Sequence, residues 1–281
     1  MISADIKTKT PVRAESPVRP DQRPPAGSVL REGSAKNGVS SIRGFAADVR
    51  SLVRSGRLRL LVPMFTYMVA YLICFMLIEH WNRLHYTVIH TAVDDMIPFV
   101  PVFVLPYVMW FPYVLGFVLF LALKHRETYH RVCTCLVIGM TVFVAVSVVY
   151  PNIHMLRPET MPVDNAFTKM ISMLYLADTP TNLTPSIHVF NSLAVMAGAW
   201  QWDWRTDAGR VYAAGIRNAW RTAITTIGML IILSTMFIKQ HSFSDVVIAV
   251  GLFLFTYILV YRFGFTFLGS RRRRPVLQRS Y

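Results

Sequence analysis

The chain has 281 residues, of which 54% are hydrophobic and only 16% are charged, and its mean hydropathy is +0.42. Soluble domains usually carry about a quarter of charged residues, so this composition excludes an ordinary soluble protein. The formal net charge of +14 raises the question of nucleic-acid binding. Residues 1–59 hold twelve basic and five acidic residues, and residues 262–281 hold six basic and none acidic. The excess charge therefore belongs to the two ends, where it predicts contact with anionic lipid and no nucleic-acid partner.

The N-terminal segment, residues 1–57, is rich in Pro, Ser, Gly and Arg and has no sustained apolar period. This composition predicts a disordered, basic cytoplasmic tail. Nothing in it resembles the apolar part of a cleavable signal peptide. We therefore expect the first spanning segment to act as the insertion signal.

Six apolar segments approach the roughly 20 residues that a helix needs to cross a bilayer. They cover approximately residues 60–79, 99–123, 132–150, 185–202, 219–238 and 243–262. Three prolines at 101, 106 and 112 predict a bent or re-entrant start to the second. The fourth is short and semi-polar, which favours a helix buried among its neighbours. The predicted fold is an all-α, polytopic bundle of six transmembrane helices over residues 58–263, with a basic cytoplasmic tail over 264–281.

The positions of Lys and Arg predict how these spans are oriented. With a cytoplasmic N-terminus, one side receives both tails, the turn at 124–131 and the loop at 203–221, which hold 25 of the 29 basic residues. The other side keeps Arg83, Arg157, Lys169 and Lys239. We therefore expect a multi-pass plasma-membrane protein with both termini in the cytoplasm. The extracytoplasmic segments are then 80–98, 151–184 and 238–242.

Three polar clusters remain, and this topology places all three on the extracytoplasmic side. Leu-Arg-Pro at 156–158 follows the third span, Thr-Pro-Ser-Ile-His at 184–188 opens the fourth, and 234–245 joins the fifth to the sixth. A lone His near a helix end is more often a hydrogen-bonded structural residue than a catalyst. Ionisable groups beside spanning segments are costly, however, so three clusters at one depth indicate a functional site.

Two histidines and a carboxylate in these clusters suit phosphoryl transfer. His241 and Asp245 lie four residues apart at a helix start, so they share a face. The carboxylate can hold one imidazole nitrogen and leave the other free as a nucleophile. His188, in the first turn of another helix, can protonate the departing oxygen.

Three further residues are candidates for binding the phosphate. Arg157 offers a planar fork for two phosphate oxygens, and Lys239 could add a second positive charge. Ser186 precedes His188 at a helix start, where unpaired backbone N–H groups and the helix dipole favour an anion. Such donors stabilise the transferred charge without a metal, so neither a metal nor another cofactor is expected.

The clusters resemble the three motifs of the type 2 phosphatidic acid phosphatase (PAP2) superfamily, which is related in fold to vanadium haloperoxidases. That family reads Lys-x6-Arg-Pro, Pro-Ser-Gly-His and Ser-Arg-x5-His-x3-Asp. Here Arg157-Pro158, Pro185-Ser186-Ile187-His188 and Ser234…His241…Asp245 match in order and spacing, within about residues 60–262. The resemblance implies a six-helix PAP2-like core. It also implies that His241 is phosphorylated, that Asp245 orients it, that His188 is the general acid, and that Arg157 and Ser186 contact the phosphate.

Three motif positions depart from the family pattern. Tyr150 occupies the position of the first-motif Lys, Thr235 that of the third-motif Arg, and Ile187 that of the second-motif Gly. Two phosphate-binding cations of the family are thus absent, and Lys239 could replace one of them. This pattern resembles the branch that includes inositol phosphorylceramide synthases and similar bacterial membrane proteins.

The leading hypothesis is a metal-independent lipid phosphate phosphatase of the outer leaflet, which acts through a phosphohistidine. Phosphatidate, phosphatidylglycerophosphate and polyprenyl diphosphate are the expected substrate classes. One alternative is a lipid headgroup phosphotransferase of the inositol phosphorylceramide synthase type, and a second is a non-catalytic lipid-binding protein. The residues indicate neither the particular lipid nor the oligomeric state.

Two other polar segments stay open to more than one interpretation. Asp94 and Asp95 lie near three histidines at 80, 85 and 90, which could bind a divalent cation. The five-residue spacing of these histidines does not share a helix face, so a polar lid over the site is favoured. The segment 178–182 could contact a headgroup or form an Asx-type turn. The three cysteines are predicted to be reduced packing residues.

Overall fold

Five helices in the computed structural model are long and apolar enough to cross a membrane, as an integral membrane protein requires. The structure describes residues 58–81, 85–204 and 213–267, so the tail predicted at 1–57 and residues 268–281 of the second tail lie outside it. The five helices are α2 (Leu58–Glu79), α4 (Val104–Lys124), α5 (Arg126–Val149), α8 (Ala214–Phe237), and α9 (Phe243–Tyr257) with its π-helical continuation η3 (Ile258–Arg262). They correspond to five of the six predicted spans.

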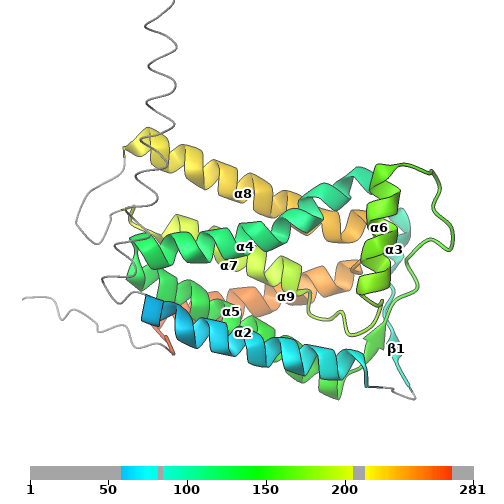
Figure 1. Cartoon of the computed structure of the whole chain (residues 1–281), viewed down its shortest axis with the longest axis horizontal. Helices are drawn as coiled ribbons and strands as arrows, with labels where there is room; N and C mark the ends of the chain where they lie inside the picture. Colours follow the sequence, from blue (N-terminus) through cyan, green and yellow to red (C-terminus); the bar gives the residue numbers. More distant parts are fainter. Residues whose placement is uncertain (1–57, 82–84, 205–212, 268–281) are drawn as a thin grey trace, which may run out of the picture. The chain divides into compact units, whose positions relative to one another are not determined.

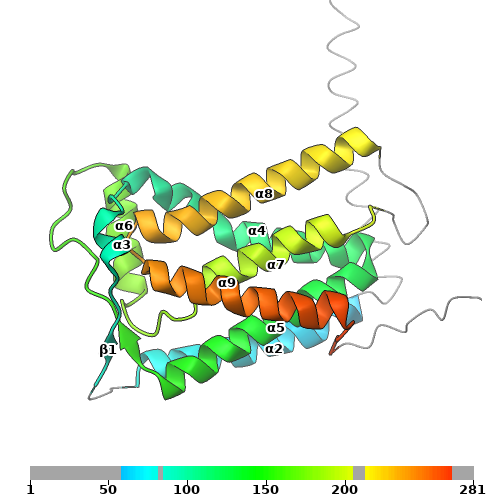
Figure 2. The same ribbon diagram turned by 180° about the vertical axis from the view of Figure 1, so that it is seen from behind.

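The fourth predicted span is the shorter helix α7 (Ile187–Gln201). Its 15 residues extend about 22 Å, less than the hydrocarbon core, so its length alone does not make it a span. It packs against α4, α5, α8 and α9, and Figures 1 and 2 show it between them. Gly139 permits the close approach of α5, because a Cβ there would lie 2.2 Å from the ring of Phe190. The semi-polar composition of α7 thus reflects burial inside the bundle, as expected.

Two predicted helix starts are refined by the structure. Pro101 opens a 3₁₀ turn, η2 (Pro101–Phe103), that leads directly into α4, so the segment is bent and not re-entrant. α5 begins at Arg126, because the ring of His125 caps its first turn by accepting from the backbone N–H of Thr128 at 3.2 Å. Most of the turn predicted at 124–131 is therefore helical.

One end of the bundle carries elements that the apolar pattern did not indicate. They are the short helix α3 (Ala92–Met96), the helix α6 (Ala166–Ala177), and a parallel pair of two-residue strands, β1 (Thr87–Val88) and β2 (Asn152–Ile153). Figures 1 and 2 both show α6 lying across the bundle end, with α3 beside it. Because the start of α7 and the start of α9 lie at this same end, these elements surround all three polar clusters.

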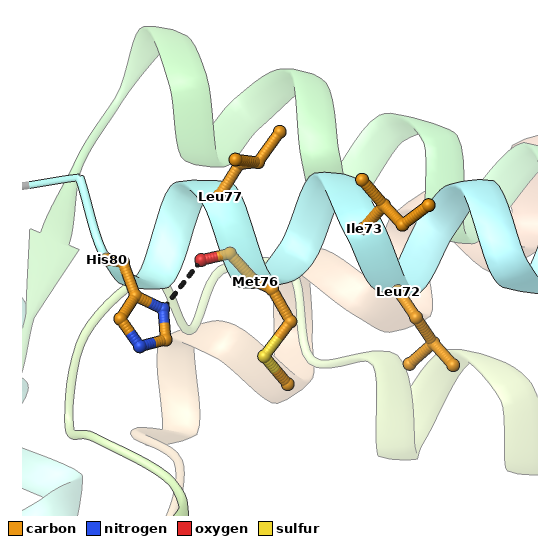
Figure 3. A pocket seen from close by; sticks show the side chains of 5 residues that line it. All are labelled: Leu72, Ile73, Met76, Leu77 and His80. Atoms are coloured by element: carbon orange, nitrogen blue, oxygen red, sulfur yellow. Dashed lines mark hydrogen bonds between the residues drawn. The ribbon is translucent and has the colours of Figure 1, made fainter.

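The outward surface of α2 is apolar. Leu72, Ile73, Met76 and Leu77 line a shallow hollow together with His80 (Figure 3). The Nδ1 atom of His80 lies 2.8 Å from the carbonyl oxygen of Met76, so this ring closes the last turn of the helix. Exposed apolar side chains of this kind are expected where a spanning helix faces lipid, and the hollow contains no arrangement of groups suited to catalysis.

Candidate active site

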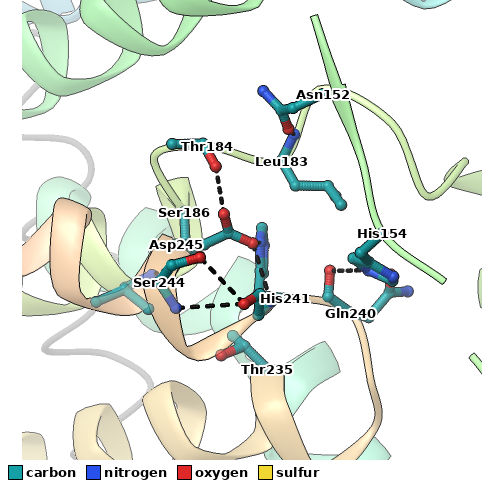
Figure 4. A network of polar contacts seen from close by, with 12 residues as sticks. Asn152, His154, Leu183, Thr184, Ser186, Thr235, Gln240, His241, Ser244 and Asp245 are labelled. Carbon is teal, nitrogen blue, oxygen red and sulfur yellow. Dashed lines mark hydrogen bonds and ion pairs between the residues drawn. The ribbon is translucent and has the colours of Figure 1, made fainter. Parts of the chain in front are cut away.

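The three polar clusters converge at the end of the bundle covered by α3 and α6. The centroids of the His188 and His241 rings lie 5.7 Å apart, so the second and third clusters meet directly. A guanidinium nitrogen of Arg157 donates to the Oε1 atom of Gln240 at 2.6 Å, which brings the first cluster to the residue next to His241. Segments more than 80 residues apart in sequence thus form one site (Figure 4).

His241 and Asp245 form the pair that their spacing predicted. The Nδ1 atom of His241 lies 3.4 Å from the Oδ2 atom of Asp245, which is an ion-pair distance but does not meet hydrogen-bond geometry. Both residues are buried, with Asp245 fully so. Within the described part of the chain no hydrogen bond reaches the other ring nitrogen, Nε2. That nitrogen is the one a nucleophilic histidine needs free.

Asp245 also has a structural task that the sequence interpretation did not assign. Its Oδ2 atom accepts from the backbone N–H of Ser242 at 2.9 Å, which completes a capping box at the start of α9. Its Oδ1 atom accepts from the hydroxyl of Thr184, in the loop before α7. The backbone N–H of Ser186 donates to the carbonyl oxygen of Asp245 at 3.4 Å. The carboxylate therefore joins the starts of α7 and α9 while it faces His241.

His188 stands in the first turn of α7 and packs on two aromatic rings of α4. Its ring centroid lies 4.5 Å from that of Tyr107 and 4.4 Å from that of Trp110. Its Nδ1 atom is buried and has no hydrogen-bond partner. The aromatic packing fixes the plane of the ring, and no hydrogen bond constrains its proton. This arrangement suits a group that gives and takes a proton.

Arg157 is held by its surroundings rather than exposed to solvent. Besides Gln240, its guanidinium donates to the carbonyl oxygen of Tyr175 at 3.3 Å and lies 4.3 Å from the centroid of that residue's ring. Burial lowers the pKa of Arg157, and the nearby Asp178 carboxylate opposes this effect. The Nε atom of Arg157 and the Nε2 atom of Gln240 are buried donors that find no partner among the described residues. Buried donors are costly when unpaired, so an anion bound here would satisfy them.

Ser186 is the N-cap of α7. Its side-chain oxygen accepts from the backbone N–H of Val189 at 3.4 Å, and the residue is fully buried. A hydroxyl that accepts one hydrogen bond can still donate its own proton, so this residue keeps the capacity to contact a phosphate oxygen.

Lys239 corrects a prediction, because the structure does not show it as a second phosphate-binding cation. Its ammonium donates to the carbonyl oxygens of Asp94 and Ile97, at 2.9 and 2.6 Å. The residue adopts a left-handed backbone conformation, with φ of 53°, in the turn between α8 and α9. The turn thereby directs the side chain toward α3.

Thr235 and Tyr150 stand where the sequence comparison expected two phosphate-binding cations, and neither side chain supplies a positive charge. The hydroxyl of Thr235 is buried and donates to the carbonyl oxygen of Ile232 at 2.7 Å within α8. Tyr150 is the C-cap of α5 and is exposed. Among the described residues, Arg157 is the cation that reaches this cluster, through its contact with Gln240.

Asp94, in the segment for which a polar lid over the site was favoured, is tied to the start of α9. It is 2% exposed and accepts the hydroxyl of Ser242 at 2.6 Å and the backbone N–H of Phe243 at 2.7 Å. It also accepts the backbone N–H and the hydroxyl of Thr91, both at 2.8 Å. Asp94 therefore clamps the start of α9 to α3. Within the described ranges, no group of three or more His, Cys, Asp or Glu is arranged to hold a metal ion.

Asp178 lies at the C-cap of α6 and belongs electrostatically to the same site. Burial raises the pKa of its carboxyl, and the nearby charges of His241 and Arg157 oppose this rise. No hydrogen bond from the described residues reaches the carboxylate, so Asp178 does not form the Asx-type turn that was one of its two interpretations. When it is ionised, this carboxyl adds negative charge near His241 and Arg157.

Asn152 and His154 support the site and were not singled out by the sequence. Asn152 is fully buried. Its side-chain oxygen accepts a hydrogen bond from the backbone N–H of Leu183 at 2.7 Å. Its backbone carbonyl oxygen accepts one from the backbone N–H of Asn182, also at 2.7 Å. His154 accepts from the backbone N–H of Leu156 through Nδ1, so it donates through Nε2 to the carbonyl oxygen of Gln240 at 3.0 Å. Figure 4 shows both beside the His241 segment. Only their position in a polar loop beside Arg157 could have indicated them.

The buried His154 should make the folded protein less stable at acidic pH. Burial lowers its pKa from 6.5 to about 4, so the unfolded chain binds a proton between these values and the folded chain does not. Stability should therefore fall as the pH drops from 6.5 toward 4, by at most about 3 kcal/mol. Unfolding of His154→Gln in detergent should show a flatter pH dependence than wild type. The exposed His85→Gln serves as the control, and equal pH dependence in all three proteins would contradict the prediction.

Comparison with known proteins adds no relative: no protein-family model, curated protein or solved structure matches this chain. The fold and the site nevertheless define a class of protein. The protein is a helical bundle of membrane type with a buried cluster of two histidines, a carboxylate and an arginine at one end.

Proposed function

We propose that this protein is a PAP2-like lipid phosphate phosphatase that acts through a phosphohistidine on the extracytoplasmic face of the membrane. The observation that carries the proposal is the cluster in which His241 faces Asp245 at 3.4 Å and lies 5.7 Å from His188, ring centroid to ring centroid. The unpaired donors of Arg157 and Gln240 at the same place supply a site for an anion.

The proposed reaction has two steps with complementary proton transfers. In the first, the Nε2 atom of His241 attacks phosphorus, the bond from phosphorus to the lipid oxygen breaks, and His188 gives its proton to that oxygen. In the second, water attacks phosphorus, His188 takes a proton from the water, and the bond from phosphorus to Nε2 of His241 breaks to release inorganic phosphate. Asp245 stabilises the positive charge that develops on the His241 ring.

Charge on the transferred phosphoryl group would be stabilised by donors of the chain itself. Arg157, the Ser186 hydroxyl and backbone N–H groups at the start of α7 are the available donors. This set supports a reaction that needs no metal, which an assay with chelator present would test directly.

The extracytoplasmic placement rests on the distribution of Lys and Arg together with the described helices. All three clusters lie at one end of the bundle, opposite the basic segments around Lys124 and Arg217. Counting α7 as a sixth, buried span would put both termini on the same side, as the charge pattern predicts.

The experiment that tests this function measures phosphate release in detergent. Purified wild-type protein should release phosphate from one or more of phosphatidate, phosphatidylglycerophosphate and a polyprenyl diphosphate, with and without chelator. His241→Ala should lower the rate by at least about 10³-fold, because the nucleophile is gone. His85→Ala, an exposed residue beyond the cluster, should keep the wild-type rate. Equal rates for wild type and His241→Ala would contradict the proposal.

A headgroup phosphotransferase is the second candidate, and Asp178 is the observation that favours it. A carboxylate beside His241 and Arg157 repels a phosphate monoester dianion, and it could accept a hydrogen bond from an acceptor alcohol. The same assay separates the two activities when labelled donor lipid is supplied with and without ceramide, diacylglycerol or inositol. A phosphatase releases phosphate without an acceptor, whereas a transferase forms labelled product only with one.

A further inference from the structure

The helix α6 is too short to cross a membrane but has two distinct faces. Its 12 residues extend about 18 Å. Thr168 and Ile171 are buried, and Phe167, Leu174 and Tyr175 pack against a small cluster at the bundle end that includes Tyr107 and Ile238. The inner face therefore holds α6 firmly across the end of the bundle (Figure 1).

The opposite face of α6 is an exposed and largely apolar stripe at helical spacing. Met173 is 70% exposed and Leu176 is 87% exposed. The stripe consists of Ala166, Lys169, Met170, Met173, Leu176 and Ala177. Its one charge, Lys169, is paired with Asp164 at 3.3 Å. Large apolar side chains gathered on one helix face usually mark a surface that is covered by something apolar.

We propose that α6 is an interfacial helix at the extracytoplasmic surface of the membrane. Its stripe contacts the acyl chains just below the lipid headgroups. The occupant is lipid because α6 contacts η2 and the start of α4, whose Val102 and Leu105 are themselves exposed. The stripe therefore lies on a helix that packs against the start of a helix long and apolar enough to span, which has exposed apolar side chains of its own. A helix that is amphipathic but too short to span lies in the plane of the interface.

The inner face of α6 also contacts the candidate active site. Tyr175 accepts a hydrogen bond from Arg157 through its carbonyl oxygen, and its hydroxyl donates to the carbonyl oxygen of Ile238 at 2.6 Å. Seating α6 in the interface places Arg157 near the level of lipid headgroups, where a lipid phosphate is found. This last consequence rests on the proposed function, whereas the seating of α6 does not.

The test measures the depth of a single fluorescent label in phosphatidylcholine vesicles. Cys74 is exposed and is replaced by Ser, while the buried Cys133 and Cys135 remain. An environment-sensitive dye is then attached to Met173→Cys. The same dye on Asp164→Cys, in the loop before α6, is the matched control. We expect lipid-borne nitroxide to quench the label at 173 several-fold more than the one at 164, and aqueous iodide to show the reverse.

Two results would overturn the inference. Equal or greater iodide quenching at 173 than at 164 would show that the stripe faces water. Nitroxide quenching at 173 that needs phosphatidylglycerol in the vesicles would show attraction by charge instead of apolar insertion. Neither result depends on catalysis, so failure of this inference and failure of the phosphatase proposal are distinguishable. Unchanged unfolding of the labelled variants in detergent shows that they have folded.

Discussion

Replacing Asp245 with Asn should abolish most of the proposed activity while leaving the protein folded. The amide oxygen of Asn can accept the Ser242 N–H that Asp245 now accepts at 2.9 Å, so the start of α9 is preserved. The loss of one charge near the helix N-terminus costs about 0.5 kcal/mol. The amide cannot stabilise an imidazolium on His241, however, and in related catalytic groups such a change lowers kcat by about 10³-fold or more.

Phosphate release and detergent unfolding, measured on the same preparations, separate these effects. Asp245→Ala should lose both activity and stability, because it removes the capping box and leaves the Thr184 hydroxyl without its acceptor. Ser244→Ala, in the same helical turn, should keep the activity. If Asp245→Asn retains activity within about tenfold of wild type, Asp245 is a capping residue only.

Asp94→Ala should be among the most destabilising single changes in the described part of the chain. It removes a buried carboxylate that accepts four hydrogen bonds from Thr91, Ser242 and Phe243. Removing one partner of a buried, hydrogen-bonded polar group usually costs about 3–5 kcal/mol, and we expect a loss in that range. The measurement is unfolding in mixed detergent. The proposed activity should also fall, since the start of α9 carries Asp245.

The adjacent Asp95 is the matched control for this change. Its carboxylate is exposed and pairs only with the exposed His90 at 2.8 Å, so Asp95→Ala should cost about 0.5 kcal/mol. Burial would raise the pKa of Asp94, but hydrogen bonds from Ser242, Phe243 and Thr91 outweigh it and lower that pKa. The stabilisation by Asp94 should therefore be present above the ordinary Asp pKa and be lost as the pH falls through the lowered value. Equal losses for the two variants would contradict the clamp.

Much of the bundle was predictable because long apolar segments have few alternatives in a membrane. Five predicted spans match helices whose ends differ from the predictions by a few residues, apart from the longer N-terminal turns of α5 and α8. The apolar pattern did not indicate α3 or α6. A helix of five residues, such as α3, is too short to show a periodic pattern of apolar residues. α6 lies within the segment predicted as the loop 151–184, and hydropathy alone did not distinguish it from that loop.

The candidate site was predictable only in part, for a reason that particular residues show. Spacing within one segment determines that His241 and Asp245 share a face, and the structure places His188 beside His241 and Arg157 beside Gln240. Spacing cannot show which polar groups are already occupied. Lys239 looked available in the sequence, yet its ammonium is bound to two carbonyl oxygens of the α3 region.

The sequence by itself thus determined the membrane-type helical bundle, the charge at its two ends and the pairing of His241 with Asp245, because hydrophobic length and local spacing are properties of single segments. Only the tertiary structure decided the rest: the clamp by Asp94, the support by Asn152 and His154, and the contact of Arg157 with Tyr175 of α6. Each of these depends on contacts between segments distant in the chain, and the free energy of burying and pairing polar groups acts only once those segments have packed together.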